Sequence, residues 1–228
     1  MKKRSKRFKN ILKSAANGKK LSTKEILDLV KKNCNVKFDE SIDVSLRINL
    51  KQSKGGDFSL RTTVKLPNGS GKKEKVAVIC EADKITEAKN SGADIAGSDD
   101  LIEKISAGKF DFTKLICTPA MMGKIGKHGK VLGPKGLMPN PKLGTVSADI
   151  KKAVTDIKTG LVEIRNDKDG NLASTIGRKS YSTEKLIENF NYFIECVKKE
   201  KPDTIKGEFI KSTFITSSMG ISYKIGAK

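Results

Sequence analysis

The strictest alternation of apolar and polar residues in this chain lies in SIDVSLRINL, residues 41–50. Its apolar residues occupy the even positions from Ile42 to Ile48, and its polar residues occupy the odd positions from Asp43 to Asn49. Side chains of a strand alternate between two faces, so this pattern predicts a β-strand with one buried and one wet face. Such strands are typical of antiparallel or mixed sheets.

Related patterns recur toward both ends of the chain. We predict further strands in five segments: 60–67, 161–167, 172–178, 208–218 and 221–225. The first should pair with 41–50 as a hairpin across the polar connection 51–57. The second and third should form a hairpin whose turn is Asp169-Gly170. Met219-Gly220 then forms the bend between the last two strands.

Two segments of these flanking regions have helical periodicity. LSTKEILDLVKKN (21–33) opens with Ser22 and places Glu25 three residues later, which is the signature of a capping box. STEKLIENFNYFIECVKKEK (182–201) places apolar residues at positions 186, 190, 193 and 197, on one face of a helix. The flanking regions therefore combine helices with half-wet strands.

The middle of the chain has a different character. Three short runs are almost entirely apolar: KVAVIC (75–80), GADIAGS (92–98) and TKLICTP (113–119). Helical patterns lie between and after them: 82–92, 98–108 and 147–158. Strands buried on both faces that alternate with helices predict a small parallel α/β layer. We place this domain at 68–159, inserted into an α+β domain made of 1–67 and 160–228.

A loop rich in glycine and proline lies near the end of the inserted domain. GKVLGPKGLMPNPKLGTV (129–146) holds four glycines, three prolines and three lysines. Proline removes backbone donors, and glycine loses entropy in regular elements, so we expect neither helix nor central strand here. An ordered loop of this length either carries function or simply returns the chain to the first domain.

Composition points to a polyanionic partner. The chain of 228 residues has 46 basic and 26 acidic residues, a formal net charge of +20. Such an excess of positive charge favours binding to phosphates, because each contact releases counterions from the nucleic acid. Aromatic residues make up 5% and tryptophan is absent, which disfavours a binder of single strands through base stacking and favours structured RNA.

An anionic membrane is the other candidate partner. The chain has no apolar run of the length that a spanning helix needs, and its basic N-terminal stretch lacks the apolar core of a signal peptide. We therefore expect a cytoplasmic protein that does not bind a membrane and that is a monomer when free.

Signals for catalysis or a metal are weak. NGSGKKEK (68–75) resembles a phosphate loop, but Leu66 stands at its first glycine position and Lys73 at its hydroxyl position. The four cysteines lie far apart and the chain has one histidine, His128. We expect reduced, buried thiols, no zinc site, no cofactor, no small-molecule substrate and no enzymatic activity. The alternative that we keep open is a nucleotide-dependent α/β enzyme using the inserted domain.

The glycine-proline loop resembles the signature of the ribosomal protein L-one family, whose members form the mobile stalk of the large subunit. Further segments resemble other blocks of that family in the expected order: FDESIDV, LPNGSGK, GADIAG, VEIRNDKDG and TSSMG. The resemblance covers nearly the whole chain. It implies an α+β domain I built from both chain ends, an inserted Rossmann-like three-layer α/β domain II, and two hinge strands between them.

The resemblance also implies a function. Similar proteins bind the stalk of 23S rRNA, help to release deacylated tRNA from the exit site, and repress translation of their own operon mRNA. Domain I should carry the main RNA surface, with contacts from Lys37, Phe38, Glu40, Ser41, Arg165, Lys168, Ser212, Ser218, Met219 and Gly220. On domain II, a second RNA contact would involve Lys130, Lys135 and Lys142. From spacing alone, Phe38 could equally be a core residue.

Two departures from the family pattern stand out. The family usually follows its first strand with an arginine-rich segment that contains proline, whereas residues 49–64 read NLKQSKGGDFSLRTTV. Ile221 follows Met219-Gly220 where the family usually has proline. A regulatory RNA binder that never joins ribosomes is a further alternative, since the same surface would serve it.

Overall fold

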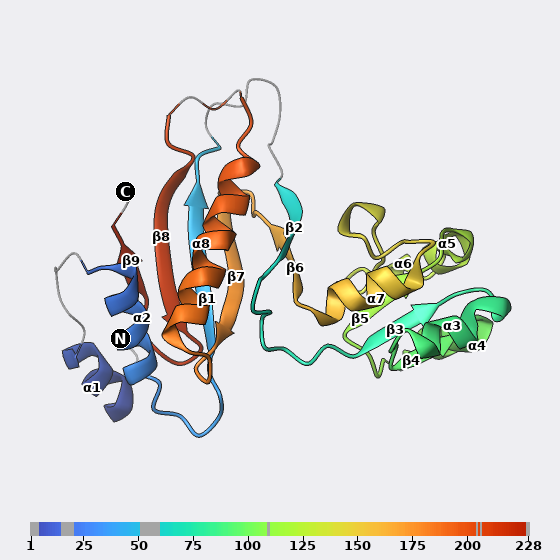
Figure 1. The fold of residues 1–228 in the computed structure, drawn as a ribbon, viewed down its shortest axis with the longest axis horizontal. Helices are drawn as coiled ribbons and strands as arrows, with labels where there is room; N and C mark the ends of the chain where they lie inside the picture. Colours follow the sequence, from blue (N-terminus) through green and yellow to red (C-terminus); the bar gives the residue numbers. More distant parts are fainter. Residues whose placement is uncertain are drawn as a thin grey trace. The chain divides into compact units, whose positions relative to one another are not determined.

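The structure of the protein is a computed structural model, which describes residues 5–14, 21–50, 60–108, 110–203, 205 and 207–226. The chain divides into two compact units, which are coloured along the sequence in Figure 1. Unit 1 comprises 1–71 and 162–228, and unit 2 comprises 72–161. Both ends of the chain therefore belong to the same unit.

Unit 1 is built on a four-stranded antiparallel sheet in the order β7-β1-β8-β9. Its elements are α1 (Lys6–Ser14), α2 (Thr23–Lys32), β1 (Ser41–Ile48), β2 (Arg61–Lys65), β6 (Leu161–Arg165), β7 (Asn171–Arg178), α8 (Thr183–Lys199), β8 (Ile210–Ser217) and β9 (Tyr223–Ile225). The strand predicted at 41–50 and the helices predicted at 21–33 and 182–201 are confirmed. Figure 1 shows α8 lying along the sheet.

The pattern of β1 decides which face of the sheet is buried. Ile42, Val44, Leu46 and Ile48 are at most 2% exposed and pack in one core with the apolar residues of α2 and α8. The capping box of α2 is formed, since Ser22 Oγ accepts from the Glu25 amide and the Glu25 carboxylate accepts from the Ser22 amide. Because their apolar residues share one core with the even-numbered residues of β1, α2 and α8 both cover that side of the strand.

The predicted hairpin between 41–50 and 60–67 is wrong. In the structure β1 pairs with β7 on one side and β8 on the other, so both of its edges are occupied. β2 instead joins β6 in a separate two-stranded sheet, where Arg61 and Glu163 form an ion pair of 2.9 Å. Alternation predicts a strand but not its partner. The connection predicted at 51–57 lies outside the described residues.

The predicted hairpin of 161–167 and 172–178 is half right. The turn exists, since the Asp167 side chain accepts from the amides of Asp169 and Asn171, and Gly170 has a positive φ of 81° that favours glycine. The strands on either side do not pair with each other, because β6 joins β2 and β7 joins β1. The chain therefore changes sheets at this turn.

Unit 2 contains a parallel sheet in the order β4-β3-β5. Its elements are β3 (Val76–Ile79), η1 (Ala82–Lys84), α3 (Ile85–Asn90), β4 (Ile95–Gly97), α4 (Asp99–Ser106), β5 (Lys114–Cys117), α5 (Pro119–Gly126), α6 (Gly129–Leu132), η2 (Pro141–Leu143) and α7 (Ile150–Lys158). The three apolar runs are thus confirmed as parallel strands. Alternate residues of β3 enter two separate cores, one shared with α4 and α5 and the other with α3 and α7.

The glycine-proline loop is more regular than its composition predicts. The expectation that 129–146 excludes helix is wrong at Gly129–Leu132, a single turn of α-helix, and Pro141–Leu143 forms a 3-10 turn. Proline at the first position of a helix loses no hydrogen bond, because that amide has no partner within the helix. The turn then ends at Gly144, whose φ is 70°.

The remaining chemistry of the described part of the chain is simple. All four cysteines are free, three of them are buried, and Cys196 is half-buried. Within the described ranges, no group of three or more His, Cys, Asp or Glu side chains is placed to hold a metal ion. None of the helices in those ranges combines the length and apolarity that crossing a membrane requires.

Candidate nucleic-acid interface

One group of predicted site residues gathers where β1 begins and β8 ends. The bend after β8, residues 217–220, is tied to the start of β1 by two reciprocal bonds. The Ser218 amide donates to the Ser41 carbonyl at 3.1 Å, and the Ser41 amide donates to Ser218 Oγ at 3.1 Å. Gly220 closes the bend through its amide, which donates to the Ser217 carbonyl at 3.2 Å. A Cβ at Gly220 would collide with Ser217 Oγ, so a side chain here would require the buried Ser217 hydroxyl to turn away.

The peptide groups of Met219 are held from both sides. Its amide donates to Glu40 Oε2 at 3.1 Å, and its carbonyl accepts from Arg7 Nη2 at 3.1 Å. Glu40 is completely buried, so its carboxylate is not available in this structure for the direct RNA contact that we predicted. Its place under the bend shows that it supports Met219 instead.

Two large apolar side chains project beside this bend. Phe38 is 54% exposed and Met219 is 47% exposed, and the neighbouring Lys37 is exposed. The alternative of Phe38 as a core residue is therefore wrong. An aromatic ring and a polarizable thioether next to a lysine and the Ser218 hydroxyl can meet a sugar, a phosphate and a 2′-hydroxyl together.

Three other predicted residues lie elsewhere in unit 1. Ser212 stands opposite Arg47 in the β1–β8 ladder, six positions along β1 from Ser41, or about 20 Å. Arg165 and Lys168 are exposed at the end of β6 and in the turn before β7. The predicted residues thus form two groups rather than one cluster.

The turn that presents Lys168 is held by its neighbour Asp167. Hydrogen bonds from the Asn171 side chain, and then from backbone amides of the turn, lower the pKa of the Asp167 carboxyl. The carboxylate is therefore ionised at neutral pH and keeps these bonds. Lys168 consequently projects from a turn of fixed geometry.

The odd-numbered face of the sheet lies between the two groups. Directly opposed residues of an antiparallel ladder share a face, so the ladders define three rows across β7, β1 and β8. We call these side chains the open face: Thr175, Asp43 and Thr216; Ala173, Ser45 and Phe214; Asn171, Arg47 and Ser212. All nine are exposed or half-buried, and Asp43 Oδ1 accepts from Thr175 Oγ1 at 2.7 Å. This face joins the bend to Ser212.

Sequence reasoning missed most of the open face and Arg7. The signal for the face was present, because the odd positions of 41–50 are polar, but only the register of β7 and β8 shows what stands beside them. The signal for α1 was also present, because Phe8, Ile11 and Leu12 have helical spacing. Ile11 is indeed buried, at 3% exposure.

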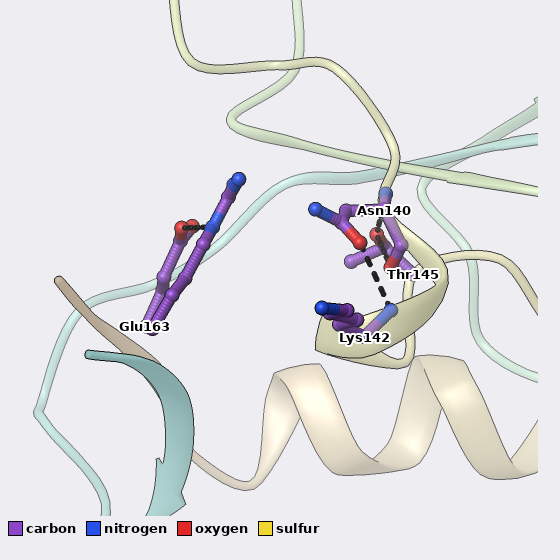
Figure 2. A network of polar contacts seen from close by, with 5 residues as sticks. Asn140, Lys142, Thr145 and Glu163 are labelled. Atoms are coloured by element: carbon purple, nitrogen blue, oxygen red, sulfur yellow. Dashed lines mark hydrogen bonds and ion pairs between the residues drawn. The ribbon is translucent and has the colours of Figure 1, made fainter. Parts of the chain in front are cut away.

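In unit 2 the glycine-proline loop presents its lysines from a fixed scaffold. Figure 2 shows Asn140 with the two loop residues that it contacts, Lys142 and Thr145. Asn140 Oδ1 accepts from the Lys142 amide at 2.9 Å, and the Asn140 amide donates to Thr145 Oγ1 at 2.7 Å. The side chains of Lys130, Lys135 and Lys142 are all exposed. The Lys135 ammonium also lies 3.7 Å from the centre of the Phe110 ring, a cation–π contact that restrains it against the unit.

Comparison with known proteins shows the family of the chain. Residues 30–221 match the Ribosomal protein L1p/L10e family. The chain is 57% identical to the large ribosomal subunit protein uL1 of Pelagibacter ubique (strain HTCC1062) over 222 residues, which cover 97% of this chain and 96% of the relative. It is 43% identical to uL1 of Protochlamydia amoebophila (strain UWE25) over 221 residues, covering 97% and 93%. The chain therefore belongs to the Ribosomal protein L1p/L10e family.

Proposed function

We propose that this protein is a constituent of the large ribosomal subunit that binds the stalk of 23S rRNA through unit 1. Membership in a family of ribosomal proteins makes it a ribosomal protein and not an enzyme, which removes the nucleotide-dependent alternative. The observation that carries the RNA assignment is the bend, where Ser218 and Met219 are exposed and are tied to the start of β1, three residues after the exposed Phe38.

The open face extends this surface in a chemically suitable way. The hydroxyl groups of Ser45 and Ser212 can both donate and accept hydrogen bonds, as the ribose 2′-hydroxyl also does. Those of Thr175 and Thr216 donate to Asp43 and to the Ser217 carbonyl, so they meet RNA as acceptors. An RNA helix presents its 2′-hydroxyls and base edges in a wide, shallow minor groove, which suits a flat sheet with short side chains. Arg47 on this face supplies positive charge for phosphates. Its ladder partner Asn171 follows closely in sequence on Arg165 and Lys168, which supply further positive charge.

Two finer roles belong to the same proposal. Exit-site tRNA would meet the glycine-proline loop of unit 2, where Lys130 and Lys142 are exposed on a scaffold held by Asn140. Repression of the protein's own operon would use the bend and the open face a second time, on a message that copies the rRNA site. In this proposal the protein needs no metal or cofactor, because its contacts are made by side chains and backbone groups.

The test compares the stalk RNA with an analogue of the same sequence that lacks 2′-hydroxyls. Log affinity for RNA should fall linearly with log salt, by about 0.7–0.9 per phosphate neutralised. Ser218→Ala should cost about 0.5–1.5 kcal/mol on RNA and less on the analogue. Lys142→Ala, as the control on unit 2, removes a charge and no hydroxyl, so any effect it has should be the same on both nucleic acids. Equal affinities for RNA and analogue in the wild type, with no effect of Ser218→Ala, would refute the assignment.

A binder of free regulatory RNA would give the same binding curves, so location needs a separate measurement. The ribosomal proposal predicts that the protein sediments with large subunits through a sucrose gradient. A protein that stays at the top of the gradient while it binds its message would support the regulatory alternative.

A further inference from the structure

Met219 presents its side chain from a peptide that two distant residues hold. The Glu40 carboxylate accepts a hydrogen bond from the Met219 amide, 179 positions away in sequence. Arg7 donates a hydrogen bond to the Met219 carbonyl, 212 positions away. These two side chains occupy the peptide groups of Met219, while its thioether remains 47% exposed. A residue in a bend usually has its backbone groups satisfied by water or by neighbouring residues, whereas here two distant side chains fix the backbone from which the exposed thioether projects.

Arg7 reaches the bend from an anchored helix. It lies in the first turns of α1, and Ile11, one turn further along, is buried at 3% exposure. The guanidinium is half-buried and is planar, with donors in a rigid fork, so a bond to a carbonyl restrains the acceptor in direction as well as distance. The other basic residues of α1, Lys6, Lys9 and Lys13, are exposed.

We propose that Arg7 is a positioning residue for RNA recognition: with Glu40 it holds the backbone of Met219 so that the thioether is presented to the RNA from one fixed position. This inference rests on the proposed function and assigns to α1 a role other than that of a basic tail. A basic tail acts through charge, so each of its residues affects all RNAs alike and changes the salt dependence. Arg7 acts through a hydrogen bond to backbone, so it affects specific binding and leaves the salt slope unchanged.

The experiment uses the full-length protein with Arg7→Ala, Arg7→Gln and the matched control Lys9→Ala, which removes the same charge from the exposed side of α1. Affinities for stalk RNA and for random RNA are measured against salt. Arg7→Ala should lose about tenfold on stalk RNA alone, the worth of one hydrogen bond from a charged donor. Arg7→Gln keeps an N–H donor and should recover part of that loss. Lys9→Ala should change both RNAs equally.

A second readout does not depend on RNA. The methyl resonance of Met219, assigned among the five methionines by its absence in Met219→Leu, should shift in Arg7→Ala and stay in place in Lys9→Ala. An unshifted methyl in Arg7→Ala overturns the proposal. So does an equal loss on both RNAs with a smaller salt slope, which would make Arg7 a phosphate contact. If the wild type does not prefer stalk RNA at all, the proposed function fails, and the methyl shift still decides whether Arg7 holds Met219.

Discussion

Replacing Asn189 by alanine should destabilise unit 1 through lost hydrogen bonds rather than lost packing. Asn189 lies within α8 and is completely buried. Its Oδ1 accepts from the Asn68 amide at 3.0 Å, and its Nδ2 donates to the carbonyls of Gly69 at 3.0 Å and Ile176 at 2.7 Å. One amide side chain thus satisfies three backbone groups, on the edge strand β7 and on the segment that leaves unit 1.

The magnitude follows from that count. A hydrogen bond contributes about 0.5–1.5 kcal/mol net, and a buried group left without a partner costs more, so Asn189→Ala should lower the free energy of unfolding by about 2–4 kcal/mol. With a urea dependence near 2 kcal/mol/M, the unfolding midpoint should fall by about 1–2 M. Far-UV circular dichroism in urea measures this shift.

Two variants sharpen the test. Asn191→Ala truncates the same side chain at an exposed position of α8 and should shift the midpoint very little. Asn189→Asp keeps the acceptor for Asn68 but places a carboxylate against the carbonyls of Gly69 and Ile176, so it should be less stable than the wild type at neutral pH. If Asn189→Ala unfolds within about 0.5 kcal/mol of Asn191→Ala, water replaces the amide and the reasoning is refuted.

Three other predictions follow from the structure. A chain that joins residues 1–71 to 162–228 through a short linker should keep most of the specific affinity for stalk RNA; a folded product that does not distinguish stalk from random RNA would exclude unit 1 as the site. Gly220→Val should cost about 1–3 kcal/mol of RNA binding, because its side chain meets Ser217 Oγ, whereas Gly226→Val, with open space around it, should bind normally. Burial raises the pKa of the Cys117 thiol to about 11, above its ordinary value of 9.0, so stability is full below pH 9 and is lost as the pH rises through 11. Urea unfolding should show a loss of about 2 kcal/mol by pH 11 that Cys117→Ala does not share.

Local elements of this fold follow directly from the sequence, whereas strand partners do not. The capping box at Ser22 and the even-numbered apolar residues of β1 depend on interactions within a few positions, so their patterns predict them well. β2 does not pair with β1 because β7 and β8 occupy both edges of β1, and those contacts span more than 100 positions. No local pattern contains contacts of that range, so neither predicted hairpin could be judged from its own segment.

The candidate site shows the same division. Resemblance to a family identified Phe38 and Met219, and both are exposed beside Ser218. It did not distinguish a residue that faces RNA from one that supports such a residue, and Glu40 belongs to the second kind because its carboxylate is buried under the bend. It also could not show Arg7 at the Met219 carbonyl, since that contact joins the two ends of the chain.

The pairing of β1 with β8 also sets the order in which the protein can fold as it is synthesised. Unit 2 is one continuous stretch, 72–161, so all its strands are available once that stretch has emerged. β1 emerges earlier but must wait for β7 and β8, and closing those long loops costs entropy that only the finished sheet repays. Unit 2 therefore folds first, while β1 is still unpaired. Since Ser218 must meet Ser41 to form the bend, a nascent chain acquires its proposed RNA site only after β8 and the residues that follow it have emerged.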